Sequence, residues 1–270
     1  MSSRTSTPAT IVIRNIESLA EMREVEQLQR DVWGVDDLEV IPTLALKPQT
    51  EVGAILMGAF AEGRMVGFVF GFPGILDGET IIHSDMLGIR EGYRSNNLGY
   101  LLKLAQREAA IARGVKRITW TFDPLQSRNA HFNFAKLGGI SDRYYVDYYG
   151  VTSSFLHRFG TDRLWVTWLL ESERVKARVE GQSLPHPPVA DLPRLVRVGE
   201  DLEPIAGDPI NGPQVIIEIP GELKSHHERW REATRHAFTS AIDAGYVVEE
   251  FYVSDDRKVG SYLLTQDSQN

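Results

Sequence analysis

The sequence contains no cysteine among its 270 residues, which excludes disulfides, thiolate metal ligands and a cysteine nucleophile. It also lacks an apolar run of the roughly 18 residues that a membrane span requires. Positive charge is not in excess, because 37 Asp and Glu against 29 Lys and Arg give a net charge of −8. These absences argue against nucleic acid or an anionic membrane as the main partner. They predict a cytoplasmic protein.

The composition is that of a globular protein, with 42% hydrophobic and 24% charged residues. Apolar periodicity predicts an α/β chain. The expected elements, in chain order, are a helix at 16–32, a hairpin of strands at 54–60 and 65–72, a strand at 80–89, a helix at 98–113, a strand at 116–122, a helix at 129–137, and strands at 143–149 and 164–170. Gly34 and Gly114 are expected to end the first two helices. The second helix is expected to turn Leu98, Leu101, Leu102, Ala105, Ala109 and Ala112 inward.

Four parts are expected along the chain. Residues 1–10 are polar and predicted to be disordered, 11–175 form the first domain, 176–213 are a proline-rich connector, and 214–270 form a β-α-β-β segment. In that last segment, Ser225 and Glu228 fit a capping box at the start of a helix. The order of its elements repeats the end of the first domain, which suggests a partial duplicate.

The turn between the strand at 80–89 and the following helix carries the clearest functional signal. It reads Arg94-Ser95-Asn96-Asn97-Leu98-Gly99-Tyr100. A strand-to-helix turn directs free backbone N–H groups and the positive end of a helix dipole at one point, which suits a diphosphate. Gly99 allows close approach of the backbone, and Asn97 tolerates a left-handed conformation. An ordinary capped turn is the alternative interpretation.

This turn resembles the acyl-CoA-binding motif of the GNAT superfamily of N-acyltransferases, Arg/Gln-x-x-Gly-x-Gly/Ala, which stands here as Arg94-x-x-Asn97-x-Gly99. One glycine is replaced by asparagine. The strand KRITWTF and the helix NAHFNFAKLGG resemble that superfamily's fifth strand and fourth helix. The chain is similar to a little-characterised bacterial branch of predicted acetyltransferases with an extra C-terminal segment, and TWTFDPLQ-x-RNAHFN is the most distinctive stretch.

The resemblance implies a mixed central sheet splayed between its fourth and fifth strands. Acetyl-CoA would be the cosubstrate, with its pantetheine arm in the gap and its diphosphate on the turn. The implied CoA-binding residues are Leu87, Gly88, Ile89, Arg94, Ser95, Asn96, Asn97, Leu98, Gly99, Tyr100, Asn129 and Asn133. An amine would attack the thioester directly, so no covalent enzyme intermediate is required.

His83 and Asp85 are the candidate proton acceptors. Strand periodicity places both on one face, near the expected thioester. Asp123 ends the next strand, where its carboxylate would orient a substrate ammonium or form an Asx turn before Pro124. Asn129 and Asn133, four residues apart, are expected on one helix face, although capping also explains Asn129.

Family members often carry a tyrosine in this helix as the acid for the leaving thiolate, but Phe134 stands at that position. A nearby hydroxyl is the candidate replacement, and we select Tyr149 among Tyr144, Tyr145, Tyr148 and Tyr149. These tyrosines are otherwise expected as half-buried strand residues. His226 and His227 face different directions on a helix and predict no metal site.

Two functional hypotheses follow. The first is an enzyme that moves an acetyl or other short acyl group from CoA to a small-molecule amine. The second is a non-catalytic acyl-CoA-binding or assembly module. Nucleotide binding by the same turn lacks the Lys-Ser/Thr of a P-loop and the ribose-binding acid of a dinucleotide fold. The strands of the tail suggest a homodimer through an exposed sheet edge.

Overall fold

The computed structural model describes residues 10–94, 97–150, 154, 157–182 and 189–266. Its contacts divide the chain into two compact units, 1–118 and 119–270. The boundary between the units lies at residues 118 and 119, whereas the expected connector, 176–213, lies inside the second unit. The predicted four-part organisation, including the partial duplicate, stays a prediction. In the described part of the chain, no helix is long and apolar enough to cross a membrane.

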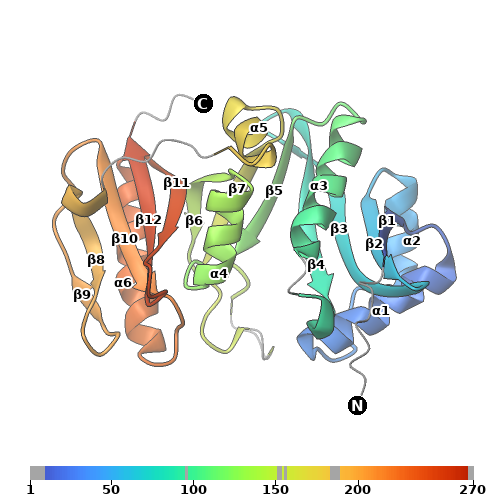
Figure 1. Ribbon diagram of the computed structural model, residues 1–270, viewed down its shortest axis with the longest axis horizontal. Coiled ribbons are helices and arrows are strands. Elements are labelled where there is room, and N and C mark those ends of the chain that lie inside the picture. Colours follow the sequence, from blue (N-terminus) through green and yellow to red (C-terminus); the bar gives the residue numbers. More distant parts are fainter. Residues whose placement is uncertain (1–9, 95–96, 151–153, 155–156, 183–188, 267–270) are drawn as a thin grey trace, which may run out of the picture. The chain divides into compact units, whose positions relative to one another are not determined.

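The first unit is a four-stranded antiparallel sheet with helices on both faces (Figure 1). Its strands pair in chain order. The elements are β1 (Ile11–Asn15), α1 (Leu19–Trp33), α2 (Thr43–Glu51), β2 (Ile55–Ala61), β3 (Arg64–Leu76), β4 (Glu79–Ile89), a 3-10 turn (Glu91–Tyr93) and α3 (Leu98–Ile111).

Alternation along β3 divides the core of this unit in two. Phe68 and Phe70 pack with Leu28 of α1 on one face. Val69 packs with Leu102 of α3 on the other face. The sheet is therefore buried on both sides, which explains why β2 and β3 read as nearly continuous apolar runs.

Local signals place the ends of these helices. Gly34 ends α1 in a left-handed conformation, as predicted, and Gly114 has a φ of 75° just beyond α3. Helix α2 follows Pro42 and contains Pro48, in a segment for which the sequence pattern predicted no helix. Strand β1, which sequence patterning did not indicate, pairs along its whole length with β2.

The second unit contains a mixed sheet in the order β5-β7-β6-β11-β12-β10-β8-β9. Its strands are β5 (Arg117–Phe122), which begins in the first unit, β6 (Ile140–Tyr145), β7 (Arg163–Leu169), β8 (Arg194–Val198), β9 (Pro204–Ala206), β10 (Gln214–Pro220), β11 (Tyr246–Val253) and β12 (Val259–Gln266). Its helical segments are α4 (Ser127–Ala130), a π-helical stretch (His131–Lys136), α5 (Glu173–Val179), a 3-10 turn (Val189–Asp191) and α6 (His227–Asp243).

The C-terminal strands continue the sheet of this unit. Val248 of β11 pairs with Ser141 of β6, and β10 pairs with β12 on one side and β8 on the other. Trp230, Phe238 and Tyr262 of this segment are fully buried.

Three local expectations in this unit differ from the structure. The predicted strand at 143–149 begins at Ile140 and ends at Tyr145, because turn residues follow. The predicted capping box is absent: His226, not Ser225, is the N-cap of α6, in a left-handed conformation and without a side-chain cap. The helix expected at 129–137 is divided into α4 and a π-helical stretch.

Candidate functional site

Strand β4 carries both candidate proton acceptors, and it contains a β-bulge between them. Phe72 pairs with His83 and Gly71 with Ser84, but Phe70 pairs with Met86, so Asp85 is an extra residue without a partner on β3. A bulge interrupts the alternation of faces along a strand. The periodicity that predicted a shared face for His83 and Asp85 therefore does not hold here.

The His83 ring packs against Phe72, with ring centroids 5.5 Å apart. Burial, together with the charge of Lys103, lowers the pKa of His83 to about 4. The imidazole is therefore neutral at pH 7, and its low basicity makes it a poor proton acceptor.

Asp85 has the opposite tendency. Asp85 is exposed, yet nearby protein atoms partly desolvate its carboxyl and raise its pKa above the ordinary value. A carboxylate with a raised pKa is a stronger base. The electrostatics of the first unit thus favour Asp85 over His83 as the proton acceptor.

A buried polar cluster lies beside this strand, and sequence patterning missed it. Lys103 of α3 is 3% exposed, and its Nζ donates hydrogen bonds to Ser84 Oγ (2.9 Å) and Gln106 Oε1 (3.1 Å). Ser84 Oγ also donates to Gln106 Oε1 at 2.8 Å. Burial lowers the pKa of Lys103 to about 7. No motif predicts this cluster, because its three members come from two elements.

The cluster also corrects the predicted inward face of α3. Lys103 and Gln106 are buried, whereas Leu101 is 43% exposed. The buried face of α3 is therefore displaced around the helix from the face that apolar residues alone indicate.

The turn before α3 has the geometry expected of an anion site. Asn97 is the N-cap and adopts φ 54°, ψ 18°, which confirms the predicted left-handed conformation. Its side chain does not cap the helix. Tyr100 and Leu101 donate their amides to Asn97 O, whereas the amides of Leu98 and Gly99 have no acceptor among the described residues. Two N–H groups at a helix N-terminus, without acceptors in the part of the chain that the structure describes, favour an anion.

Other residues of the turn have structural contacts. Arg94 is exposed and its Nε donates to Ile89 O at 3.1 Å. A Cβ at Gly99 would lie 3.2 Å from Ile89 Cδ1 and 3.6 Å from Leu87 Cδ2. Close packing of α3 on β4 thus gives a second reason for glycine here. Ser95 and Asn96 lie outside the described residues.

The backbone of Leu87, Gly88 and Ile89 pairs with β3 on one side. Most of β5 belongs to the second unit, whereas β4 belongs to the first. The expected gap between these two strands therefore stays a prediction.

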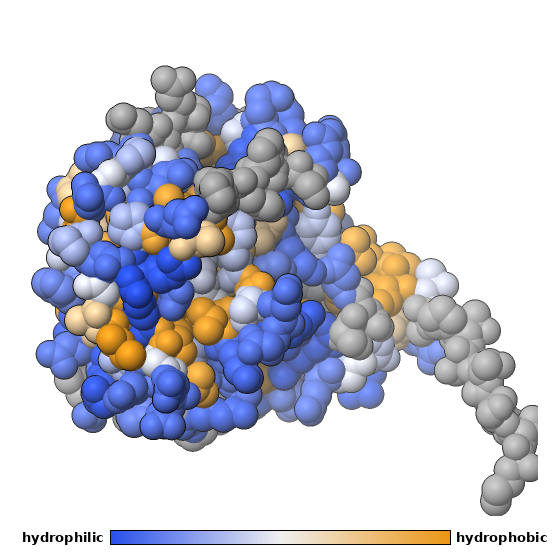
Figure 2. Space-filling model, turned by 60° about the vertical axis from the view of Figure 1, so that its left-hand side comes forward, coloured by the Kyte–Doolittle hydropathy of each residue, from blue (hydrophilic) through white to orange (hydrophobic). Residues whose placement is uncertain are grey.

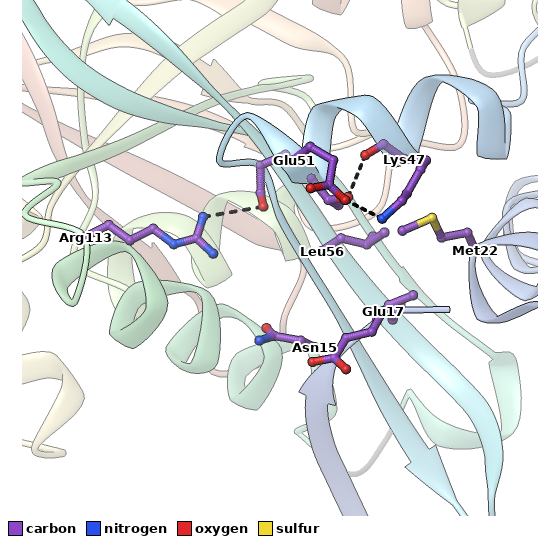
Figure 3. Close-up of a pocket in the computed structure, with 10 residues that line it drawn as sticks. Asn15, Glu17, Met22, Lys47, Glu51, Leu56 and Arg113 are labelled. Atoms are coloured by element: carbon purple, nitrogen blue, oxygen red, sulfur yellow. Dashed lines mark hydrogen bonds and ion pairs between the residues drawn. The ribbon is translucent and has the colours of Figure 1, made fainter. Parts of the chain in front are cut away.

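A separate depression of about 220 Å³ lies in the first unit beside β1, α2 and the end of α3 (Figure 3). Three of its charged side chains have partners: Lys47 pairs with Glu51, and Arg113 donates to Gly53 O at 2.6 Å. Glu17 and Asn15 complete its polar wall.

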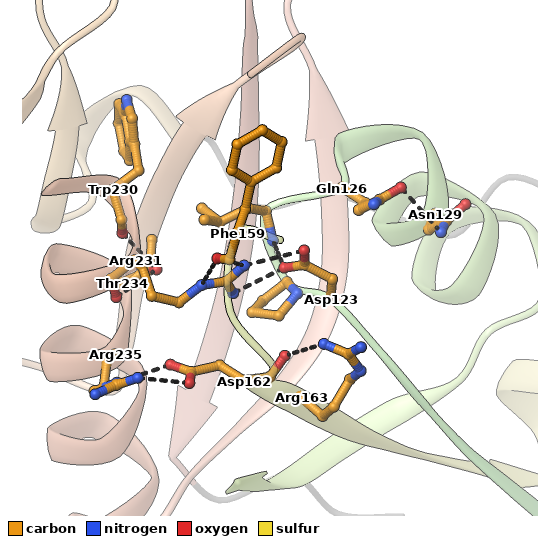
Figure 4. A network of polar contacts seen from close by, with 12 residues as sticks. Asp123, Gln126, Asn129, Phe159, Asp162, Arg163, Trp230, Arg231, Thr234 and Arg235 are labelled. Atoms are coloured by element: carbon orange, nitrogen blue, oxygen red, sulfur yellow. Dashed lines mark hydrogen bonds and ion pairs between the residues drawn. The ribbon is translucent and has the colours of Figure 1, made fainter. Parts of the chain in front are cut away.

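In the second unit, Asp123 is held by structural contacts. Its Oδ1 accepts the amide of Leu125 at 3.0 Å, which is the Asx turn predicted as one alternative. Arg231 of α6 donates to both carboxylate oxygens, at 2.8 and 3.0 Å. Figure 4 shows Arg231 and Arg235 of α6 extending toward Asp123 and Asp162. These bonds occupy the carboxylate that was expected to orient an ammonium group.

Asn129 and Asn133 do not share an environment. Asn129 is exposed, whereas Asn133 is 4% exposed and accepts a hydrogen bond from Trp120 Nε1 at 3.2 Å. The change from α4 to a π-helical stretch between them alters the repeat that predicted one face. Asn133 therefore has a structural partner within its own unit.

The aromatic contacts explain Phe134 and limit the choice of an acid. Phe134 is fully buried, with its ring 5.9 Å from those of Phe122 and Tyr262. Tyr144 donates its hydroxyl to Asp162 at 2.7 Å, and burial raises its pKa. Tyr149 remains 50% exposed, stacked on His157. Among the candidate hydroxyls, Tyr149 is thus more accessible than Tyr144.

The described residues contain no group of three His, Cys, Asp or Glu side chains that would hold a metal ion.

No family model and no curated protein matches the sequence. Solved structures do. A Desulfovibrio desulfuricans protein assigned to the GNAT family of acetyltransferases superposes with a TM-score of 0.50 over 60% of this chain and 99% of its own, at 11% identity. The matched part of the chain has a GNAT-type fold.

Two further solved structures are similar to this chain. The ribosomal-protein-S18-alanine N-acetyltransferase of Escherichia coli is 12% identical, with a TM-score of 0.48 over 60% of this chain and 96% of its own. The yncA protein of Salmonella typhimurium, solved with its cofactor acetyl-CoA, is also 12% identical, with a TM-score of 0.49 over 66% of this chain and 99% of its own. At these identities the likeness concerns the fold alone.

Proposed function

We propose that this protein is an acetyl-CoA-dependent N-acetyltransferase that acts on a small-molecule amine. The observation that carries the proposal is the turn at Asn97, where a left-handed residue precedes two amides, of Leu98 and Gly99, without acceptors among the described residues. The GNAT-type fold supports the same ligand, because the diphosphate of CoA is an anion suited to that position.

In the proposed reaction the neutral amine attacks the thioester carbonyl, and the carbon–sulfur bond breaks to release CoA thiolate. The amine proton passes to the Asp85 carboxylate, directly or through water. Tyr149 is the proposed donor to the leaving sulfur. No acyl-enzyme is formed, so the absence of cysteine imposes no constraint.

The binding half of the proposal is tested at Asn97. Asn97→Val places a β-branched residue at positive φ, where it is strained, and is expected to weaken acetyl-CoA binding at least tenfold. Asn97→Gly adopts the same conformation without strain and is expected to retain the affinity. Calorimetric titration with acetyl-CoA, ATP and NAD gives the measurement. Binding of a nucleotide but not acetyl-CoA would exclude the proposal.

The catalytic half is tested at Asp85. Asp85→Asn is expected to lower the rate of acetyl transfer by roughly 10²- to 10⁴-fold, the contribution typical of a general base, without loss of acetyl-CoA affinity. Release of CoA can be followed with a thiol reagent, because the protein has no thiol of its own. Because the base must be ionised, the wild-type rate should rise with pH through the raised pKa of Asp85, and the variant should lack this dependence.

The alternative is a non-catalytic acyl-CoA-binding module. Its support is Phe134, buried among aromatic rings at the position where the resemblance implies a tyrosine acid. Under this alternative, acetyl-CoA binds but no amine in a broad panel releases free CoA, and Asp85→Asn changes nothing measurable.

A further inference from the structure

The second unit contains a cavity of about 790 Å³ between strands β8 and β9 and helix α6. Figure 2, turned so that the β8–β9 side comes forward, shows apolar residues gathered among hydrophilic ones on this face. The volume lies within the 300–1,000 Å³ typical of small-molecule sites, which are also mostly apolar. The apolar lining consists of Leu195, Val196, Pro204, Ala206, Pro209, Ile210, Ala233 and Ala237.

Small side chains on both walls leave this space open. Helix α6 contributes Ala233, Ala237 and Ser240, spaced three or four residues apart and thus on one face. The sheet side contributes Ala206 and Gly207. Larger residues at these positions would close the cavity, so its size follows from the sequence.

Most charged groups at the rim are already neutralised. Arg229 pairs with Glu203 at 2.8 Å. Asp208 pairs with Arg197 at 2.8 Å and also accepts the amide of Arg194 at 3.0 Å. Arg229 and Asp208, the two of these residues that line the cavity, are therefore both paired with an opposite charge.

Glu232 and His236 differ from these pairs. They lie four residues apart on α6 and both line the cavity. Neither side chain has a hydrogen-bond or ion-pair partner among the described residues. Glu232 is exposed at the rim and is therefore the lining carboxylate without a protein partner among the described residues. The imidazole of His236 supplies a further hydrogen-bonding group beside it.

We propose that this cavity binds a small molecule with an apolar body and one protonated amine. The apolar body would lie between β8, β9 and the alanines of α6, and the ammonium group would pair with the carboxylate of Glu232. This binding does not depend on the proposed acetyl transfer, because none of the residues assigned to CoA or to catalysis lines the cavity.

Three probes with the same two-ring body and different charge test the proposal: 2-naphthylmethylamine, 2-naphthylmethanol and 2-naphthoate, titrated against the full-length protein. The amine is expected to bind about two- to fivefold more tightly than the alcohol, the range that a solvent-exposed ion pair contributes, and more tightly still than the carboxylate. Equal affinities, tighter binding of the carboxylate, or no binding of any probe would overturn the proposal.

Two variants locate the binding. Glu232→Gln should reduce the affinity for the amine to that of the alcohol and leave alcohol binding unchanged. Ala233→Leu should weaken binding of both, because the added side chain projects into the apolar part of the cavity. Glu228→Gln, an exposed acid of the same helix outside the lining, is the matched control and should change neither affinity.

Two further measurements check the fold of the variants and the oligomeric state of the protein. Circular dichroism checks that Ala233→Leu is folded. If it is not, Glu232→Gln, on the solvent-facing rim, still tests whether the carboxylate contributes to amine binding. Sedimentation reports on a second copy of the chain: a dimer that Ala233→Leu dissociates, with no probe bound by the wild type, would identify the cavity as an interface and overturn the proposal. Acetyl-CoA affinity should be the same in all of these variants. A negative result with the naphthyl probes would therefore overturn the cavity proposal without affecting the proposed acetyl transfer.

Discussion

At the scale of single residues, environment determines chemistry more than residue type does. His83 and Asp85 are two residues apart, yet the pKa of His83 is lowered and that of Asp85 is raised. Burial disfavours the charged form in both cases, which acts in opposite directions on a base and an acid. The residue type alone suggested His83 as the group with a pKa close to neutrality. The shifted pKa values instead favour Asp85 as the candidate proton acceptor.

Lys103 gives a prediction at this scale. Its pKa falls from the ordinary 10.5 to about 7 on folding, so between these values the unfolded chain holds a proton that the folded chain has lost. The free energy of unfolding should therefore rise with pH across this range, with a slope of at most one proton. Lys103→Met is expected to remove that rise and to raise stability at pH 7.

Urea unfolding at several pH values between 7 and 10 measures the effect. Lys176→Met, at an exposed lysine of α5, is the control and should leave the pH dependence as in the wild type. The same slope in Lys103→Met and in the wild type would contradict a buried lysine with a lowered pKa.

At the scale of elements, ion pairs between distant segments fix α6 in the second unit. Arg231 binds Asp123 and the carbonyl oxygen of Phe159, and Arg235 binds Asp162 (Figure 4). Arg235 also pairs with Asp147. Arg231 is only 7% exposed. A charge left behind in such a place is costly, because water does not solvate it fully.

Arg231→Met is therefore expected to lower the free energy of unfolding by about 3–5 kcal/mol. Arg229→Met, on the same helix, breaks a solvent-exposed pair with Glu203 and should cost at most about 1 kcal/mol. Urea denaturation of the two variants gives the comparison. Similar losses in both would mean that burial does not strengthen the Arg231 contact.

At the scale of the whole molecule, aromatic contacts and a hydrogen bond join the C-terminal segment to earlier parts of the second unit. Phe238 stacks on Tyr144 at 5.5 Å, and Tyr262 contacts Phe134 at 5.9 Å. Tyr262 also donates its hydroxyl to Pro124 O at 2.6 Å. All of these contacts lie within the second unit.

A chain of residues 1–180 is thus expected to lose cooperative thermal unfolding, because β6 and the helix at Phe134 would expose apolar surface. A chain of residues 1–266 keeps every described strand and should unfold like the full-length protein. Circular dichroism during heating distinguishes them. Cooperative unfolding of 1–180 with unchanged acetyl-CoA affinity would support the domain boundary at 176–213 that the sequence predicts.

The sequence by itself determined what depends on neighbouring residues. Few residue types tolerate a left-handed conformation, so Gly34 and Asn97 could be recognised in the sequence as residues that adopt it. Apolar periodicity indicated most strands and helices. Those local signals, with the resemblance they carry, were enough for the α/β class and for the turn before α3.

Only the tertiary structure decided which polar groups are already engaged. Asp123 and Arg231 are 108 residues apart in the sequence, and Lys103 meets Ser84 from another element. The bulge at Asp85 depends on the register with β3, which no local pattern encodes. Burial and hydrogen bonding arise from segments that meet in space, and these set the pKa values, occupy the carboxylates and leave the cavity beside α6 open.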